Sequence, residues 1–393
     1  MRQRSALGLS FGNYINELEE LKEKDKMDLK RWSISLILFV FLIIPALAAA
    51  VTPTPDTGKT VWSFAYFGET EENYFHQPSD IEADAAKSLI YVVDSGNHRI
   101  VAVDFDGRFV RIIGKEGQGP GEFSRPSGAF VCPDSRLAVA DYGNNRIQVF
   151  DETGKFLSTT NTKEVRVADL MVIEDLFYTI PTFGSSGFNI NMGSDADSQP
   201  LVVVLDMKGD VVREITISDF PETQPFVRAL KHRVSLSRSP DGRLFLPFGT
   251  MNVIQVFDLE GSKLIQFDRP LPFKPMVPQL RSLKSGTQGQ SKVVQMSART
   301  DQVSRAALFG PDGLFYVLTY SVSMDEWMKQ FKDPREQTPM PMHIDVIDPN
   351  TLKPVRTLAV DPGCRAFGIL AAGRIVYIHQ DEEGELVLKC IQY

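Results

Sequence analysis

The stretch PSDIEADAAKSLIYVVDSGNHRIVAVDFDGRFVRIIGKEGQG at residues 78–119 recurs, with substitutions, as PSGAFVCPDSRLAVADYGNNRIQVFDETGKFLSTT at residues 126–160. Asp94 returns 47 residues later as Asp141, and Asn97 returns as Asn144. Self-similarity at a fixed period of roughly 20–50 residues indicates a fold built from repeated structural units. We therefore expect a repeat protein rather than a series of unrelated domains.

Each of these units predicts short β-strands separated by tight turns. Residues 89–93 and 100–103 are runs rich in β-branched residues, with Gly96 in the turn between them, and a second turn leads to residues 109–113. Glycine accepts positive φ, and Asp and Asn side chains bond to the backbone of turns. The polar residues of the first turn are therefore predicted to be structural: Asp94, Asn97, Arg99, Asp141, Asn144 and Arg146.

The order of these features closely resembles the NHL repeat: an apolar strand, D-x-x-N-x-R-I, a second apolar strand and a D-x-x-G turn. Residues 78–160 carry the full motif twice, and residues 168–393 contain degenerate copies. The resemblance implies an all-β fold, a six-bladed β-propeller of four-stranded antiparallel blades. Five blades are the alternative, if the interruption of the fifth unit hides a different boundary.

The last unit, residues 365–393, has only three apolar runs. Residues 61–68, VWSFAYFG, match the fourth strand of a repeat, and Phe75 and Pro78 behind them match Phe123 and Pro126. We expect this amino-terminal strand to complete the last blade. Such a closure leaves no open seam, which removes the exposed edges of an open sheet.

The amino terminus predicts export. Residues 34–51 are an apolar run without a charged residue, preceded by a short basic segment that begins at Met27 and followed by small alanines. This order is typical of a secretory signal peptide. If translation begins at Met1 instead of Met27, the same run is an uncleaved transmembrane anchor. Both versions make the remainder extracytoplasmic, either periplasmic or secreted.

Four segments follow from these expectations. Residues 1–26 are a non-native or cytoplasmic extension, 27–50 the signal peptide or anchor, 51–60 a linker, and 61–393 the propeller.

The three cysteines, Cys132, Cys364 and Cys390, show no C-x-x-C spacing, so we expect buried free thiols and no metal cluster.

Charge is unevenly distributed along the chain. The formal net charge of -8 argues against nucleic-acid binding and against a general affinity for anionic membranes, so membrane contact is expected only through the amino-terminal segment. Residues 223–305 nevertheless contain 13 Lys or Arg and 5 Asp or Glu. This basic segment is either ordinary solvated surface or a patch for an anionic partner.

Three insertions interrupt the repeat, at residues 181–200, 268–300 and 321–342. In a four-stranded blade, the loop between the second and third strands and the connector to the next blade emerge on one face. All three insertions should therefore lie on that face, over blades three to five. The stretch SMDEWMKQFKD in the third insertion also predicts a short helix.

This face is the predicted ligand site. The residues that we expect to contact a peptide, protein or anionic glycan are Arg228, Lys231, His232, Arg233, Arg305, Trp327 and His343, with Arg305 on the innermost strand of blade five. No catalytic motif, metal-binding spacing or cofactor motif is found, since G-x-S-x-G, H-E-x-x-H and the P-loop are missing. The leading hypothesis is a monomeric recognition module without a cofactor. The alternatives are a metal-assisted lyase or lactonase at the channel mouth, as in some similar propellers, and a structural scaffold.

Overall fold

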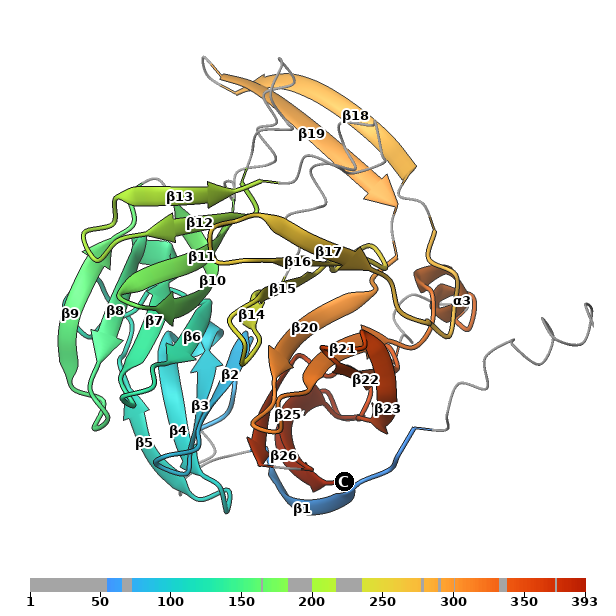
Figure 1. Ribbon diagram of the computed structural model, residues 1–393, viewed down its shortest axis with the longest axis horizontal. Helices are drawn as coiled ribbons and strands as arrows, with labels where there is room; N and C mark the ends of the chain where they lie inside the picture. The colour runs from blue at the N-terminus through green and yellow to red at the C-terminus, as the bar shows by residue number, and fades with distance from the viewer. Residues whose placement is uncertain are drawn as a thin grey trace, which may run out of the picture. The chain divides into compact units, whose positions relative to one another are not determined.

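The computed structural model describes residues 55–65, 73–163, 165–182, 200–216, 235–276, 279–288, 291–299, 301–331, 338–371 and 373–393. Thr54–Tyr393 form one compact unit. Within it, six four-stranded antiparallel sheets stand around a common centre (Figure 1), and one two-stranded sheet is separate from them. The predicted six-bladed β-propeller is therefore confirmed.

Each blade runs from an inner to an outer strand in chain order. Blade one comprises β2 (Asp80–Asp84), β3 (Leu89–Asp94), β4 (Arg99–Asp104) and β5 (Phe109–Ile113). Blade two comprises β6 (Gly128–Val131), β7 (Leu137–Asp141), β8 (Arg146–Phe150) and β9 (Phe156–Asn161). Blade three comprises β10 (Arg166–Ile173), β11 (Leu176–Thr182), β12 (Val202–Leu205) and β13 (Val211–Ile215). Blade four comprises β14 (Ser237–Arg238), β15 (Leu244–Pro247), β16 (Ile254–Phe257) and β17 (Lys263–Phe267). Blade five comprises β20 (Ser304–Phe309), β21 (Phe315–Tyr320), β22 (Met342–Asp348) and β23 (Lys353–Ala359). Blade six comprises β24 (Ala366–Ala371), β25 (Arg374–Gln380) and β26 (Leu386–Gln392), and its outer strand is the amino-terminal β1 (Lys59–Phe64).

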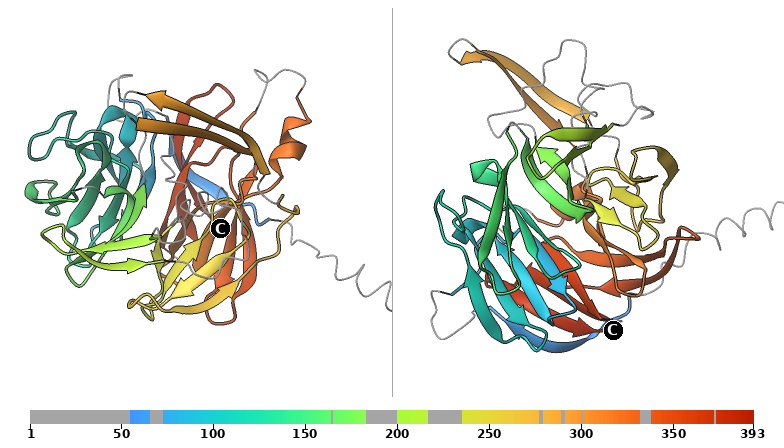
Figure 2. Two further views of the ribbon diagram at one scale, coloured as in Figure 1. Left: turned by 90° about the horizontal axis from the view of Figure 1, so that it is seen from above. Right: turned by 60° about the vertical axis from the view of Figure 1, so that its left-hand side comes forward.

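The amino-terminal strand closes the ring as predicted, but at a shifted position. β1 pairs antiparallel with β26, and both lie together in each view (Figure 2). The strand begins at Lys59, two residues before the predicted start, and ends at Phe64. Asp56 already bridges to Leu358 of blade five, so the carboxyl-terminal part of the predicted linker is paired with the propeller. The aromatic run alone did not reveal that Lys59 and Thr60 continue the ladder.

Trp62 fastens this closure to blade one. Its indole nitrogen donates a 3.0 Å hydrogen bond to the carbonyl of Phe105, in the turn between β4 and β5. Its ring stacks on Phe64 at 5.5 Å and packs so closely on Gly107 that a Cβ there would lie 2.7 Å from it. Trp62 therefore adds a hydrogen bond and a ring contact to the apolar cluster that joins the last blade to the first.

We expect Trp62→Ala to lower the free energy of unfolding by about 2 kcal/mol, because a half-buried aromatic ring and one hydrogen bond are lost. Chemical denaturation measures the change. Val61→Ala is the matched control on the same strand, since Val61 is exposed and should change stability by less than about 0.5 kcal/mol. Equal losses in both variants would show that the seam does not depend on Trp62.

The hydrophobic core lies between the blades. Among the described residues, six apolar clusters each join two neighbouring blades, as Tyr91 of blade one and Leu137 of blade two illustrate. The middle strands are packed on both faces, which explains their nearly continuous apolar sequence. Outer strands instead expose apolar side chains, among them Phe109, Val110, Leu157, Val211, Leu264 and Val355. Cys132, Cys364 and Cys390 are buried free thiols, as expected.

In blades one and two, the repeated polar motif ties the incoming connector to the blade. Asp141 is fully buried and accepts hydrogen bonds from the Ser124 amide at 2.7 Å, Asn144 at 2.9 Å and Arg146 at 2.7 Å. Arg146 and Asn144 also donate to carbonyls of the connector at Gly117, Gln118, Gly119 and Glu122. Asp94, Asn97 and Arg99 make the equivalent contacts to His76 and Tyr74 in blade one. These contacts are those of a turn and connector clamp.

Two of the three insertions are described in part. The second contains an unexpected hairpin, β18 (Gln279–Gln288) paired with β19 (Ser291–Arg299). The third contains the predicted helix, α3 (Met324–Met328), with a capping box between Ser323 and Glu326. Asp301 accepts hydrogen bonds from the amides of Met276 at 2.8 Å and Met324 at 2.9 Å, which joins the bases of both insertions. Residues 183–199 of the first insertion lie outside the described residues.

In the described part of the chain, no helix is both long enough and apolar enough to cross a membrane. The predicted signal peptide or anchor at residues 27–50 lies outside that part.

Candidate functional site

A cavity of about 410 Å³ occupies the centre of the ring. Its walls come from all six inner strands, β2, β6, β10, β14, β20 and β24, with the residues just before and after them. This cavity is the central channel of the propeller. Inner strands form its walls because each is the unpaired edge of its sheet, so its side chains and backbone face the centre.

A second cavity of about 280 Å³ adjoins the channel at one end. Ser79 and Ser235 line both cavities, and the smaller one is also lined by Pro247, Gly249, Gln302, Ser304, Arg305 and Arg365. These serines and arginines stand at or just before the starts of inner strands, where the blade connectors arrive. The smaller cavity, hereafter the mouth pocket, therefore lies on the face predicted to carry the insertions.

Two arginines give the mouth pocket its charge. Nε of Arg305 donates to the carbonyl of Arg365 at 2.8 Å and its Nη1 donates to the Tyr320 hydroxyl at 3.3 Å, while Arg365 donates to Gln380 at 3.2 Å. Burial first, and then the positive charge of Arg305, lower the pKa of Arg365. Within the described ranges, neither guanidinium forms an ion pair with a carboxylate. Two adjacent positive charges without an acidic neighbour favour an anion in the pocket.

Three carboxylates lie deeper, along the channel wall. Asp80 and Glu82 occupy alternate positions of β2, and Asp169 lies on β10. Asp80 accepts a 3.0 Å hydrogen bond from the Ala129 amide of blade two, and Asp169 accepts one of 3.4 Å from the Leu236 amide of blade four. Each carboxylate therefore satisfies an unpaired amide of the next inner strand. A structural role accounts for these contacts without a ligand.

Crowding of these carboxylates changes their protonation. Burial, and then the charge of Asp80, raise the pKa of Asp169 to about 7. Burial, and then the charges of Asp80 and Asp169, raise the pKa of Glu82 well above its ordinary value. The folded protein therefore holds protons between pH 4 and pH 7 that the unfolded chain releases. The contribution of Asp169 and its neighbouring carboxyl groups to the free energy of unfolding is therefore fully present below about pH 4 and is lost as the pH rises through about 7.

We expect Asp169→Asn to stabilise the protein at pH 8 by on the order of 1–2 kcal/mol, because an amide removes the repulsion and keeps one acceptor, while channel water screens part of the effect. At pH 4 the variant and the wild type should unfold at the same temperature. Thermal unfolding at the two pH values measures the difference. If the variant were destabilised equally at pH 4 and at pH 8, the hydrogen bonds of Asp169 would matter more for stability than its charge.

Of the predicted ligand residues that the structure describes, only Arg305 lines the mouth pocket. Arg305 lies on β20 and lines the mouth pocket. Trp327 lies on α3, partly exposed, and packs edge-on against Phe331. His343 is buried on β22 and does not line the mouth pocket. Four further predicted residues lie outside the described residues: Arg228, Lys231, His232 and Arg233.

Sequence reasoning missed Arg365 and the channel carboxylates. A repeat alignment contained the signal for Arg365, because SRAALF at residues 304–309 and CRAFGI at 364–369 place an arginine at the same position of blades five and six. Asp80, Glu82 and Asp169 had no comparable signal. Their convergence depends on which face of each inner strand points to the centre.

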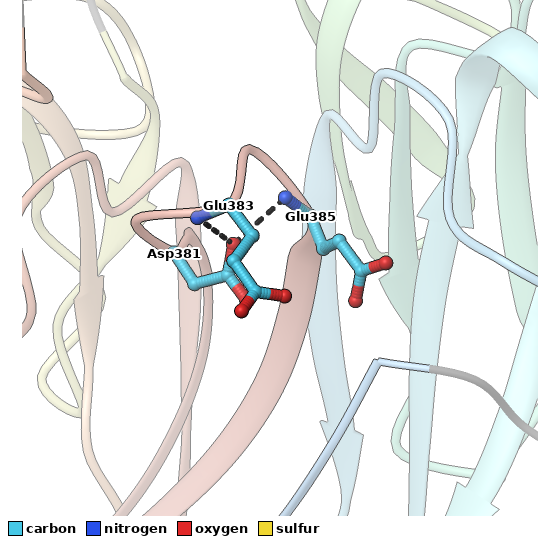
Figure 3. A group of neighbouring side chains, drawn as sticks. All are labelled: Asp381, Glu383 and Glu385. Carbon is cyan, nitrogen blue, oxygen red and sulfur yellow. Dashed lines mark hydrogen bonds between the residues drawn. The ribbon is translucent and has the colours of Figure 1, made fainter.

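One turn of blade six gathers acidic side chains that resemble a metal site. In the described part of the chain, one group of three potential ligands lies close together, Asp381, Glu383 and Glu385 in the turn between β25 and β26 (Figure 3). Asp381 there accepts hydrogen bonds from the amides of Glu383 at 3.0 Å and Glu385 at 2.8 Å. Asp104 accepts in the same way in the turn between β4 and β5. The group is therefore a turn motif, and it lines neither cavity.

Comparisons with known proteins agree with this architecture. Over 46 residues the chain is 52% identical to Protein lin-41 of Caenorhabditis elegans, a match that covers 12% of this chain and 4% of that protein. Over 115 residues it is 34% identical to NHL repeat-containing protein 3 of Homo sapiens, covering 28% of this chain and 30% of that protein. The chain thus spans less than a third of the length of these curated relatives.

A solved member of the duf4221 family from Bacteroides vulgatus matches with a TM-score of 0.53 and 10% identity, over 85% of this chain and 97% of that chain. At this identity the likeness shows the fold alone. The family model described as 6-bladed beta-propeller, DUF5128, matches residues 64–321. The chain therefore belongs to the DUF5128 family of six-bladed β-propellers, and its first two blades are built from NHL-type repeats.

Proposed function

We propose that this propeller is a recognition module that binds a carboxylate of its ligand, a peptide, protein or anionic glycan, in the mouth pocket. The observation that carries the proposal is the Arg305 and Arg365 pair in a cavity of about 280 Å³, with no acidic partner among the described residues. Arginine suits the planar, two-oxygen geometry of a carboxylate. A pocket of this size fits one residue or one sugar acid rather than a whole domain.

The channel carboxylates support the same reading. Asp80, Glu82 and Asp169 line the cavity that continues from the mouth pocket through Ser79 and Ser235. Whether protonated or ionised, these carboxyl groups offer no positive charge to an anion, so a ligand carboxylate is favoured at the two arginines rather than deeper along this wall. Recognition is thereby confined to the face that carries the insertions, where the remainder of a larger ligand contacts the loops.

Capture of defined ligands tests the proposal. A peptide library with free carboxyl termini, the same library with amidated termini, and acidic and neutral oligosaccharides are immobilised and probed with the purified propeller. Free-acid peptides or acidic oligosaccharides should be retained, and their amidated or neutral counterparts should not. Equal retention of each matched pair would refute carboxylate recognition.

We also propose that the propeller acts outside the cytoplasm. The basic, apolar and small-residue order of residues 27–50 supports export. Mass determination of the mature protein tests it: cleavage near residue 50 is expected, and a soluble cytoplasmic protein that retains residues 27–50 would contradict it.

A further inference from the structure

A serine, a histidine and an aspartate stand in a hydrogen-bonded line at the insertion end of blade five. Ser321 directly follows β21, and His343 and Asp345 lie two residues apart on the neighbouring strand β22. Oγ of Ser321 lies 2.8 Å from Nδ1 of His343, and Nε2 of His343 lies 3.2 Å from Oδ1 of Asp345. Nucleophile, base and orienting carboxylate are therefore within hydrogen-bond reach in that order.

The aspartate is held ionised and fixed in place. Its other oxygen, Oδ2, accepts hydrogen bonds from Nε of Arg269 at 2.9 Å and from the Thr319 hydroxyl at 2.8 Å. Burial alone would raise the pKa of Asp345, but the hydrogen bond from His343 and the charge of Arg269 outweigh it and lower that pKa. Oδ1 is therefore an acceptor at neutral pH, and it points at the imidazole.

This arrangement decides the tautomer of His343. Because Asp345 can only accept, Nε2 of His343 carries the proton that faces it. In the neutral imidazole Nδ1 is then the bare nitrogen, and the Ser321 hydroxyl donates to it. The two ring nitrogens are exchanged relative to the familiar hydrolase triad, but the roles of base and orienting group are the same, and such constellations are recognised by geometry and role.

Solvent exposure increases from Asp345 through His343 to Ser321, and nucleophilic catalysis requires this order because the nucleophile must be accessible. Asp345 is 4% exposed and His343 is 7% exposed, whereas Ser321 is partly exposed. The Ser321 amide donates to the Pro341 carbonyl at 2.9 Å, which extends the hairpin one step past the strands and fixes the serine at its surface end.

We propose that Ser321, His343 and Asp345 form a hydrolytic site for carboxylic esters on the insertion face of blade five. Oγ of Ser321 attacks the ester carbonyl carbon while its proton passes to Nδ1 of His343. The ester C–O bond breaks, and His343 returns the proton to the departing alcohol. Water then attacks the acyl carbon of the acyl-serine while its proton passes to Nδ1 of His343. The bond between that carbon and Oγ breaks, His343 returns the proton to Oγ, and the carboxylic acid leaves.

A fluorophosphonate probe tests this site, with mass spectrometry to locate the label. The wild type should be labelled at Ser321, and Ser321→Ala and His343→Gln should not be labelled. Ser323→Ala is the matched control, because Ser323 caps α3 two residues away and touches neither His343 nor Asp345 among the described contacts; it should label as the wild type does. Wild-type folded protein that stays unlabelled at Ser321, or is labelled at another serine, would overturn the proposal.

Hydrolysis of p-nitrophenyl acetate provides the second readout. Ser321→Ala should lower the rate by about 100-fold or more, because the attacking oxygen is lost. The melting temperature of each variant separates chemistry from folding. A rate that is unchanged in a folded Ser321→Ala protein would equally overturn the proposal. Carboxylate capture at Arg305 and Arg365 is independent of both results.

Discussion

Replacement of both Arg305 and Arg365 by glutamate is expected to lower the affinity for a captured free-acid peptide by about 100-fold or more. Each arginine lines the mouth pocket, and reversal of their charge turns two attractive partners into repulsive ones. Arg305 is exposed and Arg365 is half-buried, so each contact is weaker than a buried charge pair, but each substitution both removes an attraction and adds a repulsion. Each 1.4 kcal/mol is about tenfold in affinity. Isothermal titration with the free-acid peptide measures the change.

Arg238→Glu is the matched control for this experiment. Arg238 is also an exposed arginine on an inner strand, and it lines the channel cavity but not the mouth pocket. This single charge reversal, half the change of charge in the double variant, should leave the affinity within about threefold of wild type, since it acts on the mouth pocket only at long range and through screening ions. If Arg238→Glu and the double variant lost the same affinity for the peptide, binding would depend on the overall electrostatic potential of the protein rather than on the mouth pocket.

Asp141→Ala is expected to lower the free energy of unfolding by about 3–5 kcal/mol, since removal of one member of a buried ion pair leaves its partner uncompensated. Arg146, with a side chain 14% exposed, loses its carboxylate, and the amides of Ser124 and Asn144 lose an acceptor. The clamp between connector and blade two would open. Urea denaturation monitored by intrinsic fluorescence measures the loss.

Asp151→Ala provides the comparison within the same blade. Asp151 accepts hydrogen bonds from the amides of Thr153 and Lys155 in a solvent-exposed turn, without a buried ion pair. Its replacement should cost only about 1 kcal/mol. If both variants lost the same stability, the motif would be a set of ordinary turns rather than a clamp.

The fold could be predicted from the sequence because repetition multiplies a weak local signal. The full motif in the first two units fixed the strand pattern, and later units needed only alternating apolar runs and Asp–Gly turns to be recognised. Closure by β1 was predicted from aromatic similarity, but its start was not, because Lys59 and Thr60 are exposed and pair through backbone alone. The hairpin β18–β19 was missed for a related reason, since a stretch rich in Ser, Gly and Gln has little strand propensity.

The candidate site was much less predictable. Arg305 was found because it falls on an inner strand, whereas Arg365 became relevant only when blades five and six were placed side by side. Ser321 and His343 are 22 residues apart, and their contact depends on the register that pairs Thr319 with His343. A sequence motif search detects neither kind of convergence, because both arise from strand pairing rather than from spacing.

The claim that Arg305 and Arg365 hold a ligand carboxylate is tested most directly by a nitrogen–proton correlation spectrum of the arginine side chains during titration with a captured free-acid peptide. The Nε resonances of Arg305 and Arg365 should shift together and saturate at the affinity found by calorimetry, while that of Arg238 should stay in place. Saturable binding that leaves Arg305 and Arg365 unmoved would contradict the proposed function.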